Sequence, residues 1–353
     1  MTINLSSTRL AFVLIAVLVL FLVLSAIIPQ RDISEDQLLD WQEYLGDNYV
    51  VIDKLGLDRI YFTPTFFIVL GLLGVNLLFG NIKRFRSVYQ VERTLLKTRH
   101  LGSILFHFSL ILIMVAVILN FLYKYHSVLA MTEGQTLKDR PESYHHEFHG
   151  PLYDNEYGRF TLSLTDVLSN DDASLSLGNV AAIAVQSARA KHETEVSTNH
   201  PFELGELQFH YGLKSGYSPE FFLTDSAGND LFRSFVRVAN RKEEGKYVHR
   251  DFIVVPEDNL HLEIEVNPDS IGPDIAYRIT ALQDSVELYA GSIGSNDTVG
   301  FAGYKFTVPR LRQWCYIDVV KSPYLNLVFF GFWSALAGLT LSFVSRLKRA
   351  KAA

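Results

Sequence analysis

Four long runs of apolar residues dominate the hydropathy pattern of the chain, and none of them contains Asp, Glu, Lys or Arg. The runs occupy residues 10–29, 62–80, 101–123 and 323–344. Because about 20 apolar helical residues span the hydrocarbon core of a bilayer, each run can cross a membrane. No small-x-small cleavage site follows the first run, which is typical of a retained anchor rather than a signal peptide. The pattern therefore predicts an integral membrane protein with four transmembrane α-helices.

The segment 124–322, between the third and fourth runs, has a different pattern. Large apolar or aromatic residues alternate with polar ones, which is typical of half-buried β-strands. The clearest stretches are 160–164, 207–211, 247–255, 260–266 and 304–308. Turn-forming residues separate several of these stretches, at 225–230, 267–269 and 272–274. We expect a large, mostly-β domain, folded as a sandwich or an open barrel.

The segment 30–61 is acidic at its start and then carries apolar and aromatic residues between Leu38 and Leu57. This mixture favours a partly amphipathic segment that lies on the membrane surface. Pro64 follows it, at a position suited to the first turn of the second predicted helix.

Positive charge is distributed unevenly over the segments that connect the runs. The connection 81–100 holds six Lys or Arg residues, and the tail 345–353 holds four with no acidic residue. By the positive-inside bias, 81–100 and the two ends, 1–9 and 345–353, are expected in the cytoplasm. The segments 30–61 and 124–322 are then expected to be extracytoplasmic.

Composition excludes several classes of protein. Residues 124–321 contain 18 basic and 29 acidic residues, so this segment has no basic patch for nucleic acid. Cys315 is the single cysteine of the chain. An internal disulfide, a paired-thiol redox site and a C-x-x-C-H haem attachment motif are therefore excluded. We expect Cys315 to be dispensable.

His107 is the one ionisable side chain well inside a predicted span, apart from Tyr123 at the edge. It lies about 10 Å along the helix from His100, in the inner half of the predicted span. Ionisable residues at this depth usually face a partner helix, a cavity or a cofactor. Residue type alone leaves two readings open: an axial ligand to haem iron, or a histidine hydrogen-bonded to a neighbouring helix.

Other histidines give weaker signals. His100 suits a head-group or cytoplasmic-surface role. His126, just beyond the third run, could ligate an outer haem or sit in the interfacial belt. The pattern His145-His146-x-x-His149 superficially resembles a metal cluster, but it falls between prolines and glycine without a supporting ligand.

Polar and small residues inside the runs indicate contacts between helices. Asn76 is a buried amide that could form a hydrogen bond to another helix. Gly331, Ala335 and Gly338 lie on one side of the fourth predicted helix and permit a close approach, within this subunit or to another.

Several short motifs follow one another along the whole chain in a characteristic order. They are 27–30 (Ile-Ile-Pro-Gln), 55–61, 65–67, 76–78, 84–85, 100–102, 107–110, 133–135 (Glu-Gly-Gln) and 319–323. In this order they resemble the ResB-like cytochrome c biogenesis proteins. Two departures are Gly80, where the family often has cysteine, and Lys321-Ser322-Pro323 in place of Asp-Pro-Gly.

The resemblance implies one half of a two-component, system II cytochrome c synthase in the bacterial cytoplasmic (inner) membrane. Such a complex carries haem b across the lipid bilayer and attaches it to apocytochrome c, and the large domain is periplasmic. The other half is a CcsA-type protein with a Trp-rich loop, which this chain lacks, so the subunit is not expected to be catalytic alone. The resemblance favours His107 as a haem axial ligand and, more weakly, His126 as an outer ligand.

Two other functions remain open from the residues themselves. One is a b-type electron-transfer cytochrome, which needs two axial histidines at matched depth. The other is a haem-free assembly or sensory scaffold. An absorption spectrum of the purified chain would separate them.

Overall fold

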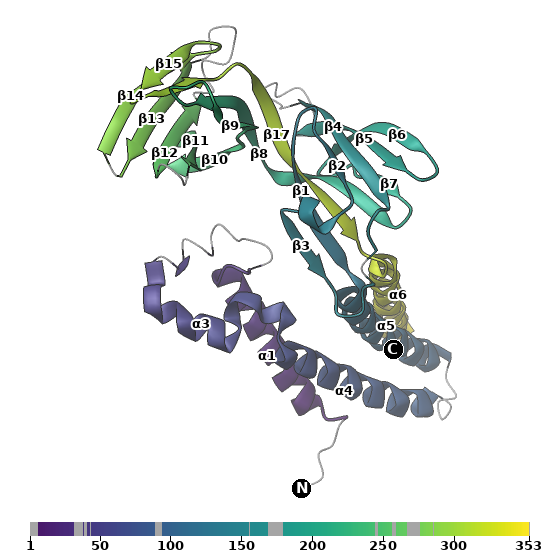
Figure 1. Cartoon of the computed structure of the whole chain (residues 1–353). Coiled ribbons are helices and arrows are strands. Elements are labelled where there is room, and N and C mark those ends of the chain that lie inside the picture. Colours follow the sequence, from purple (N-terminus) through teal and green to yellow (C-terminus); the bar gives the residue numbers. More distant parts are fainter. Residues whose placement is uncertain are drawn as a thin grey trace. The chain divides into compact units, whose positions relative to one another are not determined.

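The computed structural model describes residues 6–31, 38, 41–42, 44–88, 94–154, 156–168, 179–243, 246–255, 259–266, 276–284 and 286–352. The chain forms two compact units (Figure 1). We call them the helical unit, Met1–Leu122 with Pro323–Ala353, and the β-rich unit, Tyr123–Ser322. The turns predicted at 267–269 and 272–274 lie outside the described residues.

The helical unit contains four long apolar helices, as the hydropathy pattern predicts. They are α1 (Thr8–Ile27), α4 (Pro64–Val88), α5 (Thr94–Tyr123) and α6 (Leu325–Ala352). Each contains a stretch long and apolar enough to cross a membrane: Thr8–Ile27, Pro64–Arg86, His100–Tyr123 and Leu325–Ser345. Both α4 and α5 extend past their apolar runs into 81–100, of which 89–93 lie outside the described residues.

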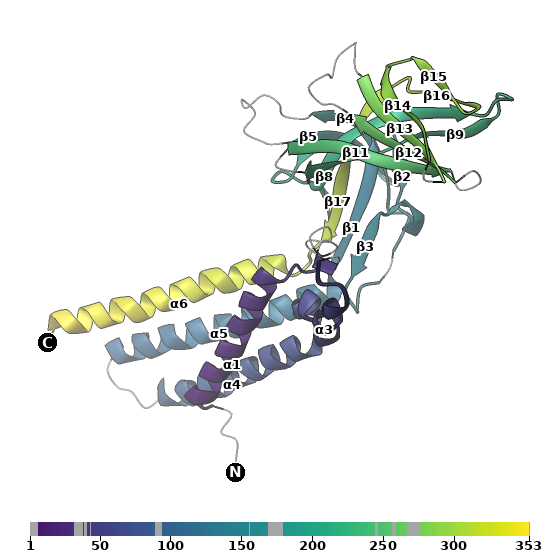
Figure 2. The ribbon, with the colours of Figure 1, turned by 90° about the vertical axis from the view of Figure 1, so that its left-hand side faces the viewer.

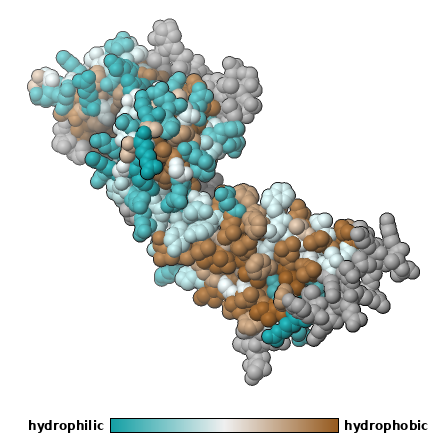
Figure 3. Space-filling view, turned by 90° about the vertical axis from the view of Figure 1, so that its right-hand side faces the viewer, coloured by the Kyte–Doolittle hydropathy of each residue, from teal (hydrophilic) through white to brown (hydrophobic). Residues whose placement is uncertain are grey.

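Large apolar side chains cover the outside of these helices (Figure 3). Phe12, Phe332 and Trp333, for example, are each more than half exposed. Such a continuous apolar surface is unfavourable in water but is the surface that hydrocarbon requires. The chain is therefore a multi-pass membrane protein.

Small and polar residues lie where the helices meet. A Cβ atom added to Gly338 of α6 would lie 2.6 Å from the backbone nitrogen of Phe106 in α5, so the two helices pack almost backbone to backbone. They run alongside each other in both ribbon views (Figures 1 and 2). In α4, the Asn76 amide donates to the carbonyl of Ser7, 3.1 Å away, at the start of α1. The predicted interhelical roles of Asn76 and of the small residues of α6 are thus confirmed within the unit.

Short helices connect α1 to α4: η1 (Gly46–Asn48), α3 (Tyr49–Leu55) and η2 (Leu57–Phe62). The Gln30 amide closes the connection, because Nε2 donates to the Leu57 carbonyl at 3.0 Å and Oε1 accepts from the Ile60 N–H at 3.1 Å. Asp58 is fully buried and accepts from Arg31 at 2.5 Å and from the Tyr49 hydroxyl at 2.8 Å. Two of the motifs of the sequence, 27–30 and 55–61, thus meet in one polar network.

The β-rich unit is built from antiparallel strands. They are β1 (Tyr125–Thr132), β2 (Thr136–Lys138), β3 (His146–His149), β4 (Phe160–Leu168), β5 (Val180–Ser187), β6 (Lys191–Ser197), β7 (Phe202–Leu204), β8 (Leu207–Thr224), β9 (Asp230–Phe235), β10 (Val238–Glu243), β11 (Lys246–Val255), β12 (Leu260–Val266), β13 (Ala276–Gln283), β14 (Val286–Gly294), β15 (Thr298–Phe301), β16 (Tyr304–Thr307) and β17 (Leu311–Lys321). Four of the five predicted stretches fall within these strands, and the fifth, 304–308, extends one residue past the end of β16. The predicted turn 225–230 joins β8 to β9, where the Asp225 carboxylate accepts from the Asn229 backbone at 2.8 Å.

These strands form two sheets. The larger follows the order β14-β13-β12-β11-β10-β8-β17-β1-β3, with β7, β9, β15 and β16 off this path, and the smaller follows β2-β4-β5-β6. The sequence predicts a sandwich or an open barrel. In the structure the described residues of this unit pack into two hydrophobic cores. One core joins the small sheet to β1, β8 and β17, and the other lies among β8 and β10–β16. The long strand β8 contributes to both, which links the two halves of the unit.

Candidate functional site

His107 lies in α5 and its ring is half-buried against α4. Its Nδ1 atom is 2.7 Å from Nη1 of Arg84 and 2.7 Å from the backbone carbonyl of Ser103, one turn earlier in α5. Arg84 Nη1 also lies 3.4 Å from the Ser103 hydroxyl. Arg84, Ser103 and His107 form the cluster that we take as the candidate site.

The Nδ1 atom can use only one of its two neighbours for a hydrogen bond at a time. If Nδ1 carries the proton, it donates to the Ser103 carbonyl, and Nε2 keeps a lone pair that can bind a metal. If Arg84 donates to Nδ1, the proton resides on Nε2, which then cannot bind a metal. A carbonyl that holds Nδ1–H is the usual support of a metal-ligating histidine. Among the described residues no hydrogen bond to Nε2 is found.

Arg84 is the residue of this cluster that the sequence pattern does not predict. The apolar run ends at residue 80, so the sequence places Arg84 in the basic connection 81–100, outside the predicted span. In the structure α4 remains helical to Val88, and its candidate span ends at Arg86, so Arg84 at the end of this span lies within hydrogen-bond distance of His107. Residues 81–88 contain neither Pro nor a further Gly, so the sequence is compatible with a helix that continues past the last apolar residue and includes Arg84.

His126 lies in β1 of the β-rich unit, so His107 and His126 belong to different units. Its Nε2 atom is 3.9 Å from the Asp318 carboxylate on the neighbouring strand β17. His100 is in the same helix as His107, two turns earlier.

The pattern His145-His146-x-x-His149 does not converge on a point. His146 and His149 begin and end strand β3, and residues three apart in a strand face opposite sides. The His145 ring instead lies 5.3 Å from the ring of Tyr316. In the part of the chain that the structure describes, no group of three His, Cys, Asp or Glu side chains could hold a metal ion.

Cys315 lies in the middle of β17 and is fully buried in the first core. Burial raises the pKa of its thiol to about 12. Because the thiolate is the reactive form, a thiol with this pKa is inert at neutral pH.

The Glu133-Gly134-Gln135 motif is the turn that joins the two sheets. The Glu133 carboxylate accepts from the backbone N–H of Val167 in β4 at 3.1 Å and of Gln313 in β17 at 3.0 Å. Gly134 has a positive φ of 77°, which disfavours any residue with a side chain. The motif is therefore explained by the architecture of the β-rich unit.

The geometry now defines a class: a multi-pass membrane protein with a β-rich unit inserted before its last helix and a histidine between two of its helices. Within that class, the ResB-like family matches residues 8–100 and 96–303, and the chain belongs to this family. Comparison with curated proteins gives no match. Membership of the ResB-like family assigns the protein a role in cytochrome c biogenesis.

Proposed function

We propose that the chain is the haem-handling membrane subunit of a system II cytochrome c maturation complex, with haem b as the transported substrate. His107 supplies an axial nitrogen to the haem iron from the α4–α5 pair. A CcsA-type membrane protein is the partner, and apocytochrome c is the acceptor. The family match to cytochrome c biogenesis supports this proposal.

The observation that carries the proposal is the surroundings of His107. The Ser103 carbonyl can hold Nδ1–H, which leaves the Nε2 lone pair for iron. An imidazole in hydrocarbon also needs a partner, because an unsatisfied polar group there costs several kcal/mol. Haem iron at Nε2 and the Ser103 carbonyl at Nδ1 together satisfy both ring nitrogens.

Arg84 lies on the Nδ1 side of the His107 ring, so it acts on iron binding by changing which ring nitrogen carries the proton. An Arg84 that donates to Nδ1 competes with the ligating form of His107. Contacts that draw Arg84 away from Nδ1 therefore favour iron binding. In this scheme Arg84 is a positioning residue.

The experiment compares three variants of the full chain, each expressed with its partner subunit. His107→Ala is expected to lose most of its haem and most holocytochrome c, and added imidazole should restore part of the haem absorption. Arg84→Met removes the donor that competes for Nδ1, together with the contact of Arg84 to the Ser103 hydroxyl, and it should keep its haem. His100→Ala, two turns away in the same helix, should also keep it. Haem per protein is measured by absorption, and holocytochrome c by haem staining.

Equal haem loss in His107→Ala and Arg84→Met would mean that His107 serves only as the hydrogen-bond partner of Arg84. Unchanged haem in His107→Ala would exclude it as a ligand. His126→Ala, measured alongside, tests the outer ligand that the family resemblance implies. A large haem loss in this variant alone would move the site to the β-rich unit.

We also propose that the membrane is the bacterial cytoplasmic membrane, with both termini in the cytoplasm and the β-rich unit in the periplasm. The basic residues of 81–100 and of the tail 345–353 support this orientation. Ser226, in the exposed β8–β9 turn, provides a labelling position. In a Cys315→Ala background, Ser226→Cys should react with an impermeant thiol reagent in spheroplasts, and Ser87→Cys should not. The opposite result would invert the orientation.

A further inference from the structure

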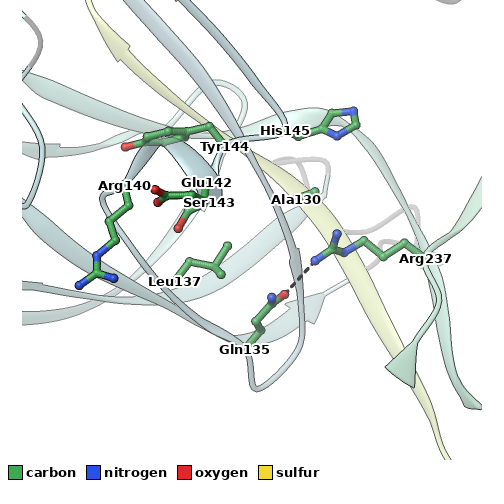
Figure 4. Close-up of a pocket in the computed structure, with 9 residues that line it drawn as sticks. All are labelled: Ala130, Gln135, Leu137, Arg140, Glu142, Ser143, Tyr144, His145 and Arg237. Carbon is green, nitrogen blue, oxygen red and sulfur yellow. Dashed lines mark hydrogen bonds between the residues drawn. The ribbon is translucent and has the colours of Figure 1, made fainter. Parts of the chain in front are cut away.

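The β-rich unit contains a cavity of about 520 Å³ between the start of β2 and the short helix η3 (Pro141–Ser143). Its volume is in the range of small-molecule sites. Figure 4 shows the side chains that line it, with Arg237 reaching toward Gln135. The lining residues are Ala130, Gln135, Leu137, Arg140, Glu142, Ser143, Tyr144, His145 and Arg237.

Arg237 is a partly buried cation, and the described residues provide no anionic partner for it. Its Nη2 atom donates to Oε1 of Gln135 at 3.0 Å, and this acceptor is neutral. Its Nε atom is buried without a hydrogen bond, and no carboxylate of the described residues forms an ion pair with the guanidinium. Burial also lowers the pKa of Arg237, because removal of water disfavours the charged form. A buried charge of this kind is costly unless an anion compensates it.

The cavity is locally positive although its unit is acidic. Arg140 adds a second guanidinium, which is exposed to solvent and has no carboxylate partner among the described residues. Glu142, the one carboxylate of the lining, is exposed to solvent. Residues 124–321 as a whole have 29 acidic against 18 basic side chains. An excess of positive charge in this setting points to an anionic ligand.

Hydrogen bonds outside the cavity hold its polar walls in place. Gln135 accepts from the Thr132 N–H at 3.0 Å, which fixes the amide that faces Arg237. On the other wall, the Tyr144 hydroxyl donates to Asp139, a fully buried carboxylate. Asp139 in turn accepts from Arg159 at 2.8 Å. Walls fixed in this way lose little entropy when a ligand binds.

We propose that this cavity binds a carboxylate carried on an apolar body. Arg237 binds the carboxylate, and Leu137, Ala130 and the Tyr144 ring contact the apolar body. Guanidinium groups bind carboxylates and phosphates alike. Inorganic phosphate has no apolar body to contact Leu137, Ala130 and the Tyr144 ring, so it is expected to bind more weakly than an apolar carboxylate. The site is independent of haem binding at His107.

The experiment uses the full chain in lipid nanodiscs and two probes that differ only in charge, 3-phenylpropionate and 3-phenylpropionamide. Saturation-transfer NMR measures the binding of each, with empty nanodiscs to correct for lipid. We expect the acid to bind and the amide to bind at least about tenfold more weakly, because the amide lacks the negative charge that strengthens a hydrogen bond from a guanidinium. Inorganic phosphate should not displace the acid at equal concentration.

Two arginine variants locate the carboxylate. Arg237→Gln should weaken binding of the acid about tenfold, whereas Arg189→Gln, at an exposed turn between β5 and β6, should leave it unchanged. Trp314 Nε1 donates to the carbonyl of Val238, next to Arg237, at 3.1 Å, so its fluorescence checks that the fold persists in each variant.

Three results would overturn the proposal: equal binding of acid and amide, full binding by a folded Arg237→Gln variant, or displacement by phosphate at equal concentration. The comparison of the two probes on the wild-type chain remains decisive even if Arg237→Gln fails to fold.

Discussion

The helical unit and the β-rich unit use their apolar residues in opposite directions. In the helical unit, large side chains such as Phe330 and Phe343 face outward, and small residues such as Gly102 and Gly338 lie between α5 and α6. In the β-rich unit, Phe209, Phe221 and their neighbours fill two cores. The difference follows from the solvent, because lipid imposes no penalty on an exposed apolar side chain, whereas water does.

The buried carboxylates of the two units differ in how far their arginine partners are exposed to solvent. In the β-rich unit, Asp139 is fully buried and its partner Arg159 is 18% exposed. In the helical unit, Asp58 is also buried, but its partners Arg31 and Arg59 are each 42% exposed and remain hydrated. We therefore expect the charge network in the core of the β-rich unit to contribute more to stability than the network between α1 and α4.

The largest expected effect comes from Asp139→Ala. Removal of Asp139 leaves the charge of Arg159 buried without a counter-ion, which lowers the free energy of unfolding by about 3–5 kcal/mol. Asp58→Ala should cost less, about 1–2 kcal/mol, because water can solvate Arg31 and Arg59. Urea unfolding is followed by Trp314 fluorescence for Asp139→Ala and by Trp41 fluorescence for Asp58→Ala, with the other two tryptophans replaced by phenylalanine. Similar losses in both variants would remove the distinction between the two networks.

Two glycines provide the next comparison. Gly134→Ala should destabilise the β-rich unit by about 1–3 kcal/mol, because φ is +77° and a Cβ would lie 2.6 Å from Arg312 Nη1. Gly71→Ala in α4 should have no adverse effect, because a Cβ there meets no atom within 4 Å. Urea unfolding is followed by Trp314 fluorescence for Gly134→Ala and by Trp41 fluorescence for Gly71→Ala. A stable Gly134→Ala variant would show that the turn between the sheets tolerates a side chain.

The smallest effect concerns Cys315. Cys315→Ala should cost only about 1 kcal/mol at pH 8, since it removes one buried sulfur. The pKa of the Cys315 thiol is 9.0 in the unfolded chain and about 12 in the folded one. Burial of the neutral thiol therefore contributes its full stability below pH 9, and this contribution is lost as the pH rises toward 12. Urea unfolding at pH 8 and pH 10.5 should therefore show a larger loss with pH for the wild type than for Cys315→Ala. Rapid reaction of the folded wild type with a thiol reagent at pH 8 would contradict this account.

Local pattern was sufficient for much of the fold. A run of uncharged apolar residues predicts a membrane helix from composition alone, and alternation over seven residues predicts a strand such as 260–266. His107 can likewise be identified from the sequence, because it is an ionisable residue within the apolar run 101–123. The family motifs could also be read directly, although their structural roles could not.

What the sequence by itself determined was the identity of the elements, because helix and strand periodicity are properties of neighbouring residues. Only the tertiary structure brought Arg84 to His107, joined Glu133 to Val167 and Gln313, and left Arg237 without an ion-pair partner among the described residues. These contacts link residues 23 to 180 positions apart. They depend on where each chain segment packs, and a pattern within one segment holds no information about the charge or shape that another segment places beside it.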